Sequence, residues 1–170
     1  MNKLADQPIQ RYHKMSGGDL SGFWFDAYGW IACYFAQLEG LSYALIDLLG
    51  SEDDKARSIR LPYQERTERA KGLVCSHLKA RGDEGLSEEW NKLLTEAKAA
   101  APVRNKILHN PLMVNLALGD PLHDEDTGIV LTHEFGRPVI KLGAVQAFSK
   151  SMHELNMRMQ DLMVRSRLTS

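Results

Sequence analysis

The sequence predicts an all-α fold, a helical bundle with a small β-hairpin inserted between the last two helices. Apolar residues recur at spacings of three and four through most of the chain, which is the period of helices with one buried face. Glycine, proline and serine–acid signals fall between these periodic segments, where helices end and begin. The pattern turns β-rich only between Pro111 and Leu142, so the strands are confined to one short insertion.

The composition is that of a globular domain. Of 170 residues, 44% are hydrophobic and 25% are charged, and the net charge of −1 creates no overall field that favours nucleic acid. Residues 1–20 are polar and predict a flexible N-terminal arm, followed by one helical domain over residues 21–170. We expect a cytoplasmic protein with no membrane contact, since the chain shows no signal-peptide pattern and no run of ~18 apolar residues. Cys33 and Cys75 are predicted to be small buried side chains in a reducing compartment.

The first predicted helix covers residues 23–49, the most hydrophobic stretch of the chain, and Gly50 stands where it would stop. Apolar residues occupy much of its circumference, so we expect a central helix that packs on more than one neighbour. Ser51, followed by three acids, predicts the capped start of a short helix that ends near Arg60.

The next two helices lead to the most informative stretch. One is predicted over residues 62–81, opened by Pro62 and ended by Gly82. The other is predicted to begin at Ser87 as its cap and to be interrupted at Pro102, which removes a backbone hydrogen bond and bends the helix. One face of this helix carries a stripe at helical spacing, formed by Trp90, Leu93, Ala97, Ala101, Arg104 and Leu108.

The C-terminal part of the chain predicts a hairpin and a closing helix. The β-rich runs at residues 127–132 and 138–141 predict two antiparallel strands joined by a turn. The last helix is predicted over residues 144–167. Its regular packing seam, which favours a role in the core or in a dimer contact, consists of Val145, Phe148, Met152, Leu155, Met159 and Leu162.

Three chemically useful side chains stand at the end of the third long helix. Arg104, Asn105 and His109 bring a guanidinium, an amide and an imidazole within six residues, and Pro111 follows directly behind them. Cleavage of RNA without a metal needs a base for the 2′-hydroxyl, an acid for the leaving 5′-oxygen and a cation for the phosphorane. Imidazole suits the first two tasks, guanidinium suits the third, and the amide could orient either group.

This stretch resembles the Arg-x4-6-His signature of HEPN domains, in which the residue after the arginine is usually polar, as Asn105 is here. The resemblance implies a bundle of four to five helices and a metal-independent endoribonuclease that uses no cofactor. Family members act in toxin–antitoxin, antiphage and RNA-processing systems, so an antitoxin or regulatory partner is also implied. One toxin branch carries tyrosine two residues after the histidine, and Pro111 departs from it here.

Helix geometry predicts that one chain is not a complete site. Residues five apart on an α-helix project about 140° from one another, so Arg104 and His109 would converge only where the helix breaks. The resemblance implies a homodimer that brings two copies of the motif together across a two-fold axis. The candidate catalytic residues are therefore Arg104, His109 and Asn105, shared between two chains.

Other interpretations stay open. Arg104 could be a buried helix residue paired with a carboxylate such as Glu39, and His109 could be a helix-end residue favoured by the dipole. The resemblance also allows a catalytically inactive HEPN-like module that binds a nucleotide or a protein. The basic stretch at residues 60–81 predicts RNA-phosphate contacts by Arg66 and Arg69, or else a solvated face.

Metal and nucleotide chemistry have little support. The donors of the predicted hairpin region lack a known ligand spacing and favour a solvated acidic turn; they are His123, Asp124, Glu125, Asp126 and His133. No metal site is therefore predicted. The chain has no Walker loop, no Gly-x-Gly-x-x-Gly, no His-Glu-x-x-His and no Gly-x-Ser-x-Gly sequence, which leaves ATP-dependent, dinucleotide, zincin and α/β-hydrolase chemistry without a motif.

Overall fold

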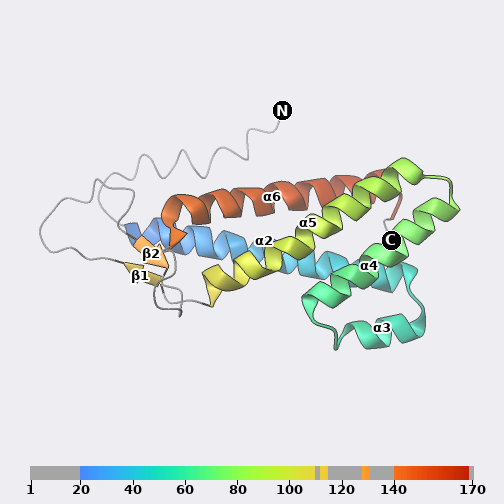
Figure 1. The fold of residues 1–170 in the computed structure, drawn as a ribbon, viewed down its shortest axis with the longest axis horizontal. Coiled ribbons are helices and arrows are strands. Elements are labelled where there is room, and N and C mark those ends of the chain that lie inside the picture. The colour runs from blue at the N-terminus through green and yellow to red at the C-terminus, as the bar shows by residue number, and fades with distance from the viewer. Residues whose placement is uncertain (1–19, 110–111, 115–127, 131–139, 169–170) are drawn as a thin grey trace, which may run out of the picture.

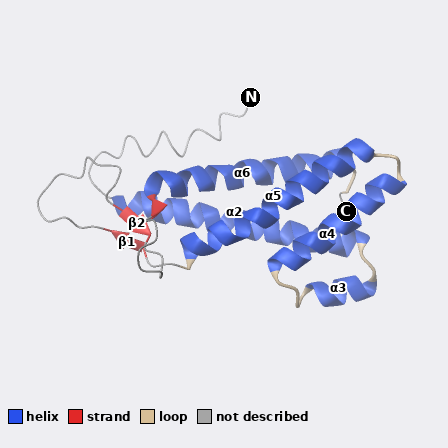
Figure 2. Ribbon diagram, in the orientation of Figure 1, coloured by secondary structure: helices blue, strands red, loops and turns tan. Residues whose placement is uncertain are grey.

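The structure is a computed structural model that describes residues 20–109, 112–114, 128–130 and 140–168. Apart from three short strands, the described residues form helices and their connections, so the fold is all-α as the sequence predicts (Figures 1 and 2). The helices are α2 (Leu20–Leu49), α3 (Glu52–Ser58), α4 (Tyr63–Ala80), α5 (Glu84–Leu108) and α6 (Leu142–Arg165). The predicted N-terminal arm, up to residue 19, lies outside the described residues.

Three short strands lie between α5 and α6 in the chain. They are β1 (Leu112–Val114), β2 (Gly128–Val130) and β3 (Ile140–Lys141), and they pair antiparallel in the order β1-β2-β3. The predicted hairpin overlaps β2 and β3, but residues 131–139, which would connect its strands, are not among the described residues. The hairpin as an inserted unit therefore stays a prediction.

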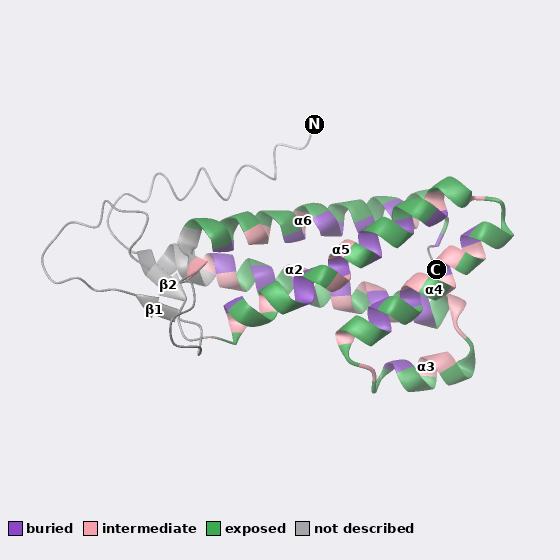
Figure 3. Cartoon of the chain, in the orientation of Figure 1, coloured by how far each residue is buried: buried purple, intermediate pink, exposed green. Residues whose placement is uncertain are grey.

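The core lies between the four long helices. Figure 3 colours the buried residues of these helices purple. Trp90 of α5 is fully buried, and its indole Nε1 donates to Ser166 Oγ at 2.8 Å, so the bulkiest core side chain has its polar atom satisfied. The predicted seam of α6 is confirmed as core, because Val145, Met152 and Met159 are all buried within this chain. Phe148 of the same seam is half-buried, and a contribution of this helix to a dimer stays a prediction.

Local end signals explain most helix boundaries. Ser51 caps α3 as predicted, because its hydroxyl accepts from the Asp54 backbone N–H while the Asp54 carboxylate accepts from Ser51. These hydrogen bonds, with the ion pair to Arg69, hold the pKa of the Asp54 carboxyl below its usual range. Gly82 follows α4 with a φ of 78°, a conformation that glycine adopts without strain.

Two predicted features of α5 are wrong. The helix begins at Glu84, and its cap residue Asp83 lies four residues before the predicted cap Ser87. Ser87 is buried instead, and its hydroxyl donates to the Cys75 carbonyl at 3.3 Å, which ties α5 to α4. The helix also continues through Pro102 without interruption.

Candidate active site

The predicted catalytic stretch lies at the C-terminal end of α5, on the side of the bundle where α2 and α6 begin (Figure 1). The helix ends at Leu108, and His109 follows with φ −99° and ψ −2° as its C-cap. The His109 backbone N–H donates to the Asn105 carbonyl at 3.0 Å, so the last turn is closed although helix bounds stop one residue earlier. Ile107, between the functional residues, is buried and anchors this turn in the core.

The structure brings Arg104, Asn105 and His109 together within one chain. The Arg104 Nη1 atom donates to Asn105 Oδ1 at 2.9 Å and lies 3.4 Å from His109 Nε2. The sequence predicted that Arg104 and His109 would converge only where the helix breaks, and α5 ends at Leu108, between the two residues. A guanidinium has only donors, so a hydrogen bond here requires an unprotonated Nε2, which is the form that a general base needs.

Arg104 is held by an aromatic ring. Its guanidinium carbon lies 4.8 Å from the centre of the Phe35 ring on α2, a distance at which a cation is attracted to the ring face. Its Nε atom is buried and has no hydrogen-bond partner in the described part of the chain. Among the described residues no carboxylate is recorded within ion-pair distance of Arg104, which is half-buried.

Phe35 and Tyr63 are supporting residues that the sequence did not single out. The Phe35 ring packs at 4.6 Å between centroids on Tyr63, whose hydroxyl donates to the Ala97 carbonyl at 3.3 Å. Burial first, and then the nearby Glu39 charge, raise the pKa of the Tyr63 hydroxyl to about 12. Phe35 belongs to the apolar stripe of α2, so nothing in the pattern distinguishes it from the other core residues of that helix.

Arg66 lies where no surface phosphate can reach it, so the predicted RNA contact does not fit its position. Its side chain is buried, and its guanidinium donates to Ser42 Oγ at 3.1 Å, to the Tyr43 hydroxyl at 2.6 Å and to the Leu61 carbonyl at 3.0 Å. It also forms an ion pair with Glu39. Glu39, considered as a partner for Arg104, is thus the partner of Arg66.

The rest of the basic stretch at residues 60–81 is also largely neutralised. Arg69 is half exposed, but its Nε donates to Asp54 Oδ1 at 2.7 Å and joins α4 to α3. Lys71 pairs with Glu68 at 2.7 Å, and Arg81 pairs with Asp83 at 2.9 Å. This pairing favours the solvated-face interpretation, and it leaves Arg69 as an RNA-contact prediction that requires an ion pair to open.

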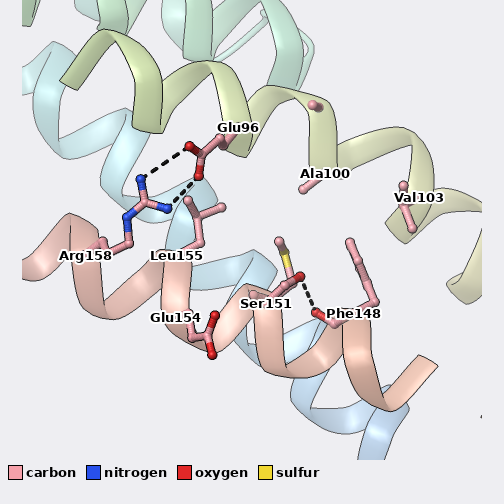
Figure 4. Close-up of a pocket in the computed structure, with 10 residues that line it drawn as sticks. Glu96, Ala100, Val103, Phe148, Ser151, Glu154, Leu155 and Arg158 are labelled. Atoms are coloured by element: carbon pink, nitrogen blue, oxygen red, sulfur yellow. Dashed lines mark hydrogen bonds and ion pairs between the residues drawn. The ribbon is translucent and has the colours of Figure 1, made fainter. Parts of the chain in front are cut away.

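A shallow groove of about 360 Å³ lies between α5 and α6 (Figure 4). At one end Arg158 Nη1 donates to Glu96 Oε2 at 2.6 Å, and Phe148 and Val103 stand at the other. None of the three predicted catalytic residues lines this groove. At the end of α5, Asn105 and His109 are exposed and Arg104 is half-buried.

The described residues show neither a metal-binding cluster nor a membrane-spanning helix. They contain no group of three or more histidine, cysteine, aspartate or glutamate side chains placed to hold a metal ion. The candidate metal ligands of the predicted hairpin region, at residues 123–126 and 133, lie outside the described residues. No helix in this part of the chain has the length and apolar character needed to cross a membrane.

Comparisons of the chain with protein-family models, with curated proteins and with solved structures found no match.

Proposed function

We propose that this protein is a metal-independent endoribonuclease of HEPN type, with Arg104 and His109 as catalytic residues and Asn105 as their positioning residue. The observation that carries the proposal is the convergence of these groups at the end of α5, with Arg104 Nη1 2.9 Å from Asn105 Oδ1 and 3.4 Å from His109 Nε2. A fixed cation beside a histidine at an accessible helix end suits a phosphodiester substrate.

The proposed reaction needs no water and no cofactor in its first step. His109 removes the proton of the RNA 2′-hydroxyl, and the resulting oxygen attacks the adjacent phosphorus. Arg104 donates to the non-bridging oxygens, where negative charge grows in the transition state. The bond to the 5′-oxygen breaks as that oxygen takes up a proton, which leaves a 2′,3′-cyclic phosphate and a 5′-hydroxyl end.

The proposed homodimer supplies the proton donor for the leaving oxygen. One histidine that has accepted a proton as base is not placed to be the acid on the opposite side of the same phosphorus. His109 of a second copy would supply that acid, and its Arg104 would supply a second cation. A closed two-fold pair gives both copies the same environment. The convergence within one chain makes each copy a preformed half of such a site.

We further propose that this enzyme acts as a toxin or an antiphage defence effector, which an antitoxin or another regulatory partner restrains. The second candidate is an inactive HEPN-like module that binds a nucleotide or a protein. The packing of Arg104 on the Phe35 ring favours it, because an arginine held in this way could bind a phosphate without cleaving it.

The experiment that tests the function is RNA cleavage in excess EDTA with analysis of the product ends. We expect cleavage that leaves 2′,3′-cyclic phosphates, and no cleavage of the same sequence made as DNA or with 2′-O-methyl groups, because the nucleophile is absent. Cleavage that stops in EDTA and returns with Mg²⁺ would contradict the mechanism. RNA binding without cleavage would select the inactive module.

A further inference from the structure

The hydrogen-bond donors of Arg104 are unequally occupied. Its Nη1 atom donates to Asn105 Oδ1 at 2.9 Å and lies 3.4 Å from His109 Nε2, so both protons of Nη1 can be used inside the motif. The Nε atom is buried without a partner, and no hydrogen bond is recorded between Nη2 and any other described residue. Nη2 is therefore the donor that Arg104 has left for an oxygen of a bound phosphate.

The group that holds this guanidinium is an aromatic ring and not a carboxylate. The centre of the Phe35 ring lies 4.8 Å from the guanidinium carbon, a distance at which the ring face attracts a cation. A carboxylate partner would neutralise the guanidinium and would compete with a phosphate for the same pair of donors. A ring face attracts the cation while it leaves the positive charge in place, which suits an arginine that has to bind an anion.

Phe35 is itself held in place from two other helices. It is buried in the core, and its ring packs on the Tyr63 ring of α4 at 4.6 Å between centroids. The Tyr63 hydroxyl donates to the Ala97 carbonyl at 3.3 Å, and Ala97 lies about two turns before Arg104 on α5. The position of the ring is thus fixed relative to the helix that carries Arg104. An arginine on such a support loses part of its freedom before a substrate binds.

We propose that Phe35 is a positioning residue for Arg104 and orients the guanidinium beside His109 so that Nη2 meets an oxygen of the bound phosphate. The inference deepens the proposed function and rests on it, because it assigns the phosphate of an RNA strand to Arg104. Phe35 acts through Arg104 and takes no part in proton transfer. Since Arg104 stabilises the charge that grows in the transition state, loss of its orientation lowers kcat more than it raises KM.

Fluorination of the Phe35 ring tests this role with little change in size. Mono-, di- and trifluorophenylalanine at this position withdraw electrons from the ring face stepwise and weaken its attraction for a cation. We expect kcat for RNA cleavage in EDTA to fall with each added fluorine, to roughly a tenth in the trifluoro variant, while KM stays within about twofold. Phe35→Leu, which removes the ring, should lose at least as much. A kcat that is independent of fluorination would overturn the proposal.

The matched control is Tyr34→Leu, which removes the neighbouring ring of α2. Tyr34 stacks on Trp30 at 5.4 Å and contacts His153 of α6 at 5.1 Å between ring centroids, so its partners are not those of Phe35. We expect its kcat to stay within about twofold of the parent value, because Arg104 keeps its support. Equal losses in Tyr34→Leu and Phe35→Leu would mean that packing alone lowers the rate, and would overturn the positioning role.

A second measurement separates this inference from the proposed function. The side-chain N–H signals of Arg104, identified in NMR spectra as those lost in Arg104→Lys, should be shifted upfield by the Phe35 ring and should move when inorganic phosphate is added. Both effects should disappear in Phe35→Leu. A parent protein that shows both effects but cleaves no RNA would reject the proposed function and keep the positioning role. Signals that are the same in Phe35→Leu and in the parent would reject the positioning role, whether or not RNA is cleaved.

Discussion

Replacing His109 by alanine is expected to lower RNA cleavage by a factor of about 10² to 10⁴, the range that a positioned general acid or base contributes. The fold should survive, because His109 is exposed at the end of α5 and contributes only its backbone N–H to the last turn. RNA affinity should change little, since Arg104 stays on the Phe35 ring. Cleavage rates at saturating RNA, with helix content measured by circular dichroism, check this prediction.

The matched control is His77→Ala, a change of a half-buried histidine on α4 that lies outside the motif. It should leave the cleavage rate within about twofold, because no proton transfer is assigned to it. Equal losses in the two variants would mean that folding, not catalysis, was affected. A His109→Ala protein that cleaves at the parent rate would remove His109 from the mechanism.

Replacing Arg66 by alanine is expected to destabilise the fold by about 3 kcal/mol, because removing one partner leaves the other groups of a buried network unsatisfied. Glu39, Tyr43 and the Leu61 carbonyl would all lose their donor. The Glu39 carboxylate is partly exposed and would regain contact with water, which keeps the expected destabilisation at the lower end of the range for buried pairs. The midpoint of urea unfolding should fall while its slope stays constant.

Arg69→Ala serves as the comparison for this second prediction. Arg69 is half exposed and paired with one carboxylate, so its loss should destabilise by no more than about 1 kcal/mol. The two arginines are three residues apart in the sequence and look alike there. A stable Arg66→Ala protein with weakened RNA binding would restore the surface role that the sequence suggested and contradict the buried network.

Signals that act within a few residues were enough to predict most of the helices. Ser51 and Gly82 work through hydrogen bonds and backbone angles of their own neighbourhood, so their meaning is visible in the sequence. The prediction that Ser87 caps α5 used the same kind of local signal and was wrong. Serine is a common cap residue, but the cap position of α5 is Asp83. The Ser87 hydroxyl instead donates to the Cys75 carbonyl on α4.

What the sequence could not supply is pairing across helices. Arg66 and Glu39 lie on α4 and α2, and only the packed bundle shows that Arg66 turns inward. The same holds for Phe35 beneath Arg104. Cys33 shows the opposite error, since its small apolar side chain predicted burial whereas the described structure leaves it exposed. Exposure of a small residue becomes visible only when the neighbouring helices are in place.

The candidate site itself was predicted in composition but not in geometry. Arg104, Asn105 and His109 were selected by residue type and by resemblance, and the structure places them in contact. The sequence predicted contact only if the helix ended between Arg104 and His109, and it could not give the position of that end, which lies at Leu108. Whether a second copy completes the site depends on assembly, which is a property of two chains.

Activity of mixed dimers tests the composite site most directly. Parent protein and His109→Ala, refolded together in equal amounts, should pair at random, so that about a quarter of the dimers contain two intact histidines. If both histidines serve one site, cleavage should fall to about a quarter of that of the same total amount of parent protein. Activity near one half, or a protein that sediments as a monomer while cleaving RNA, would contradict the composite site.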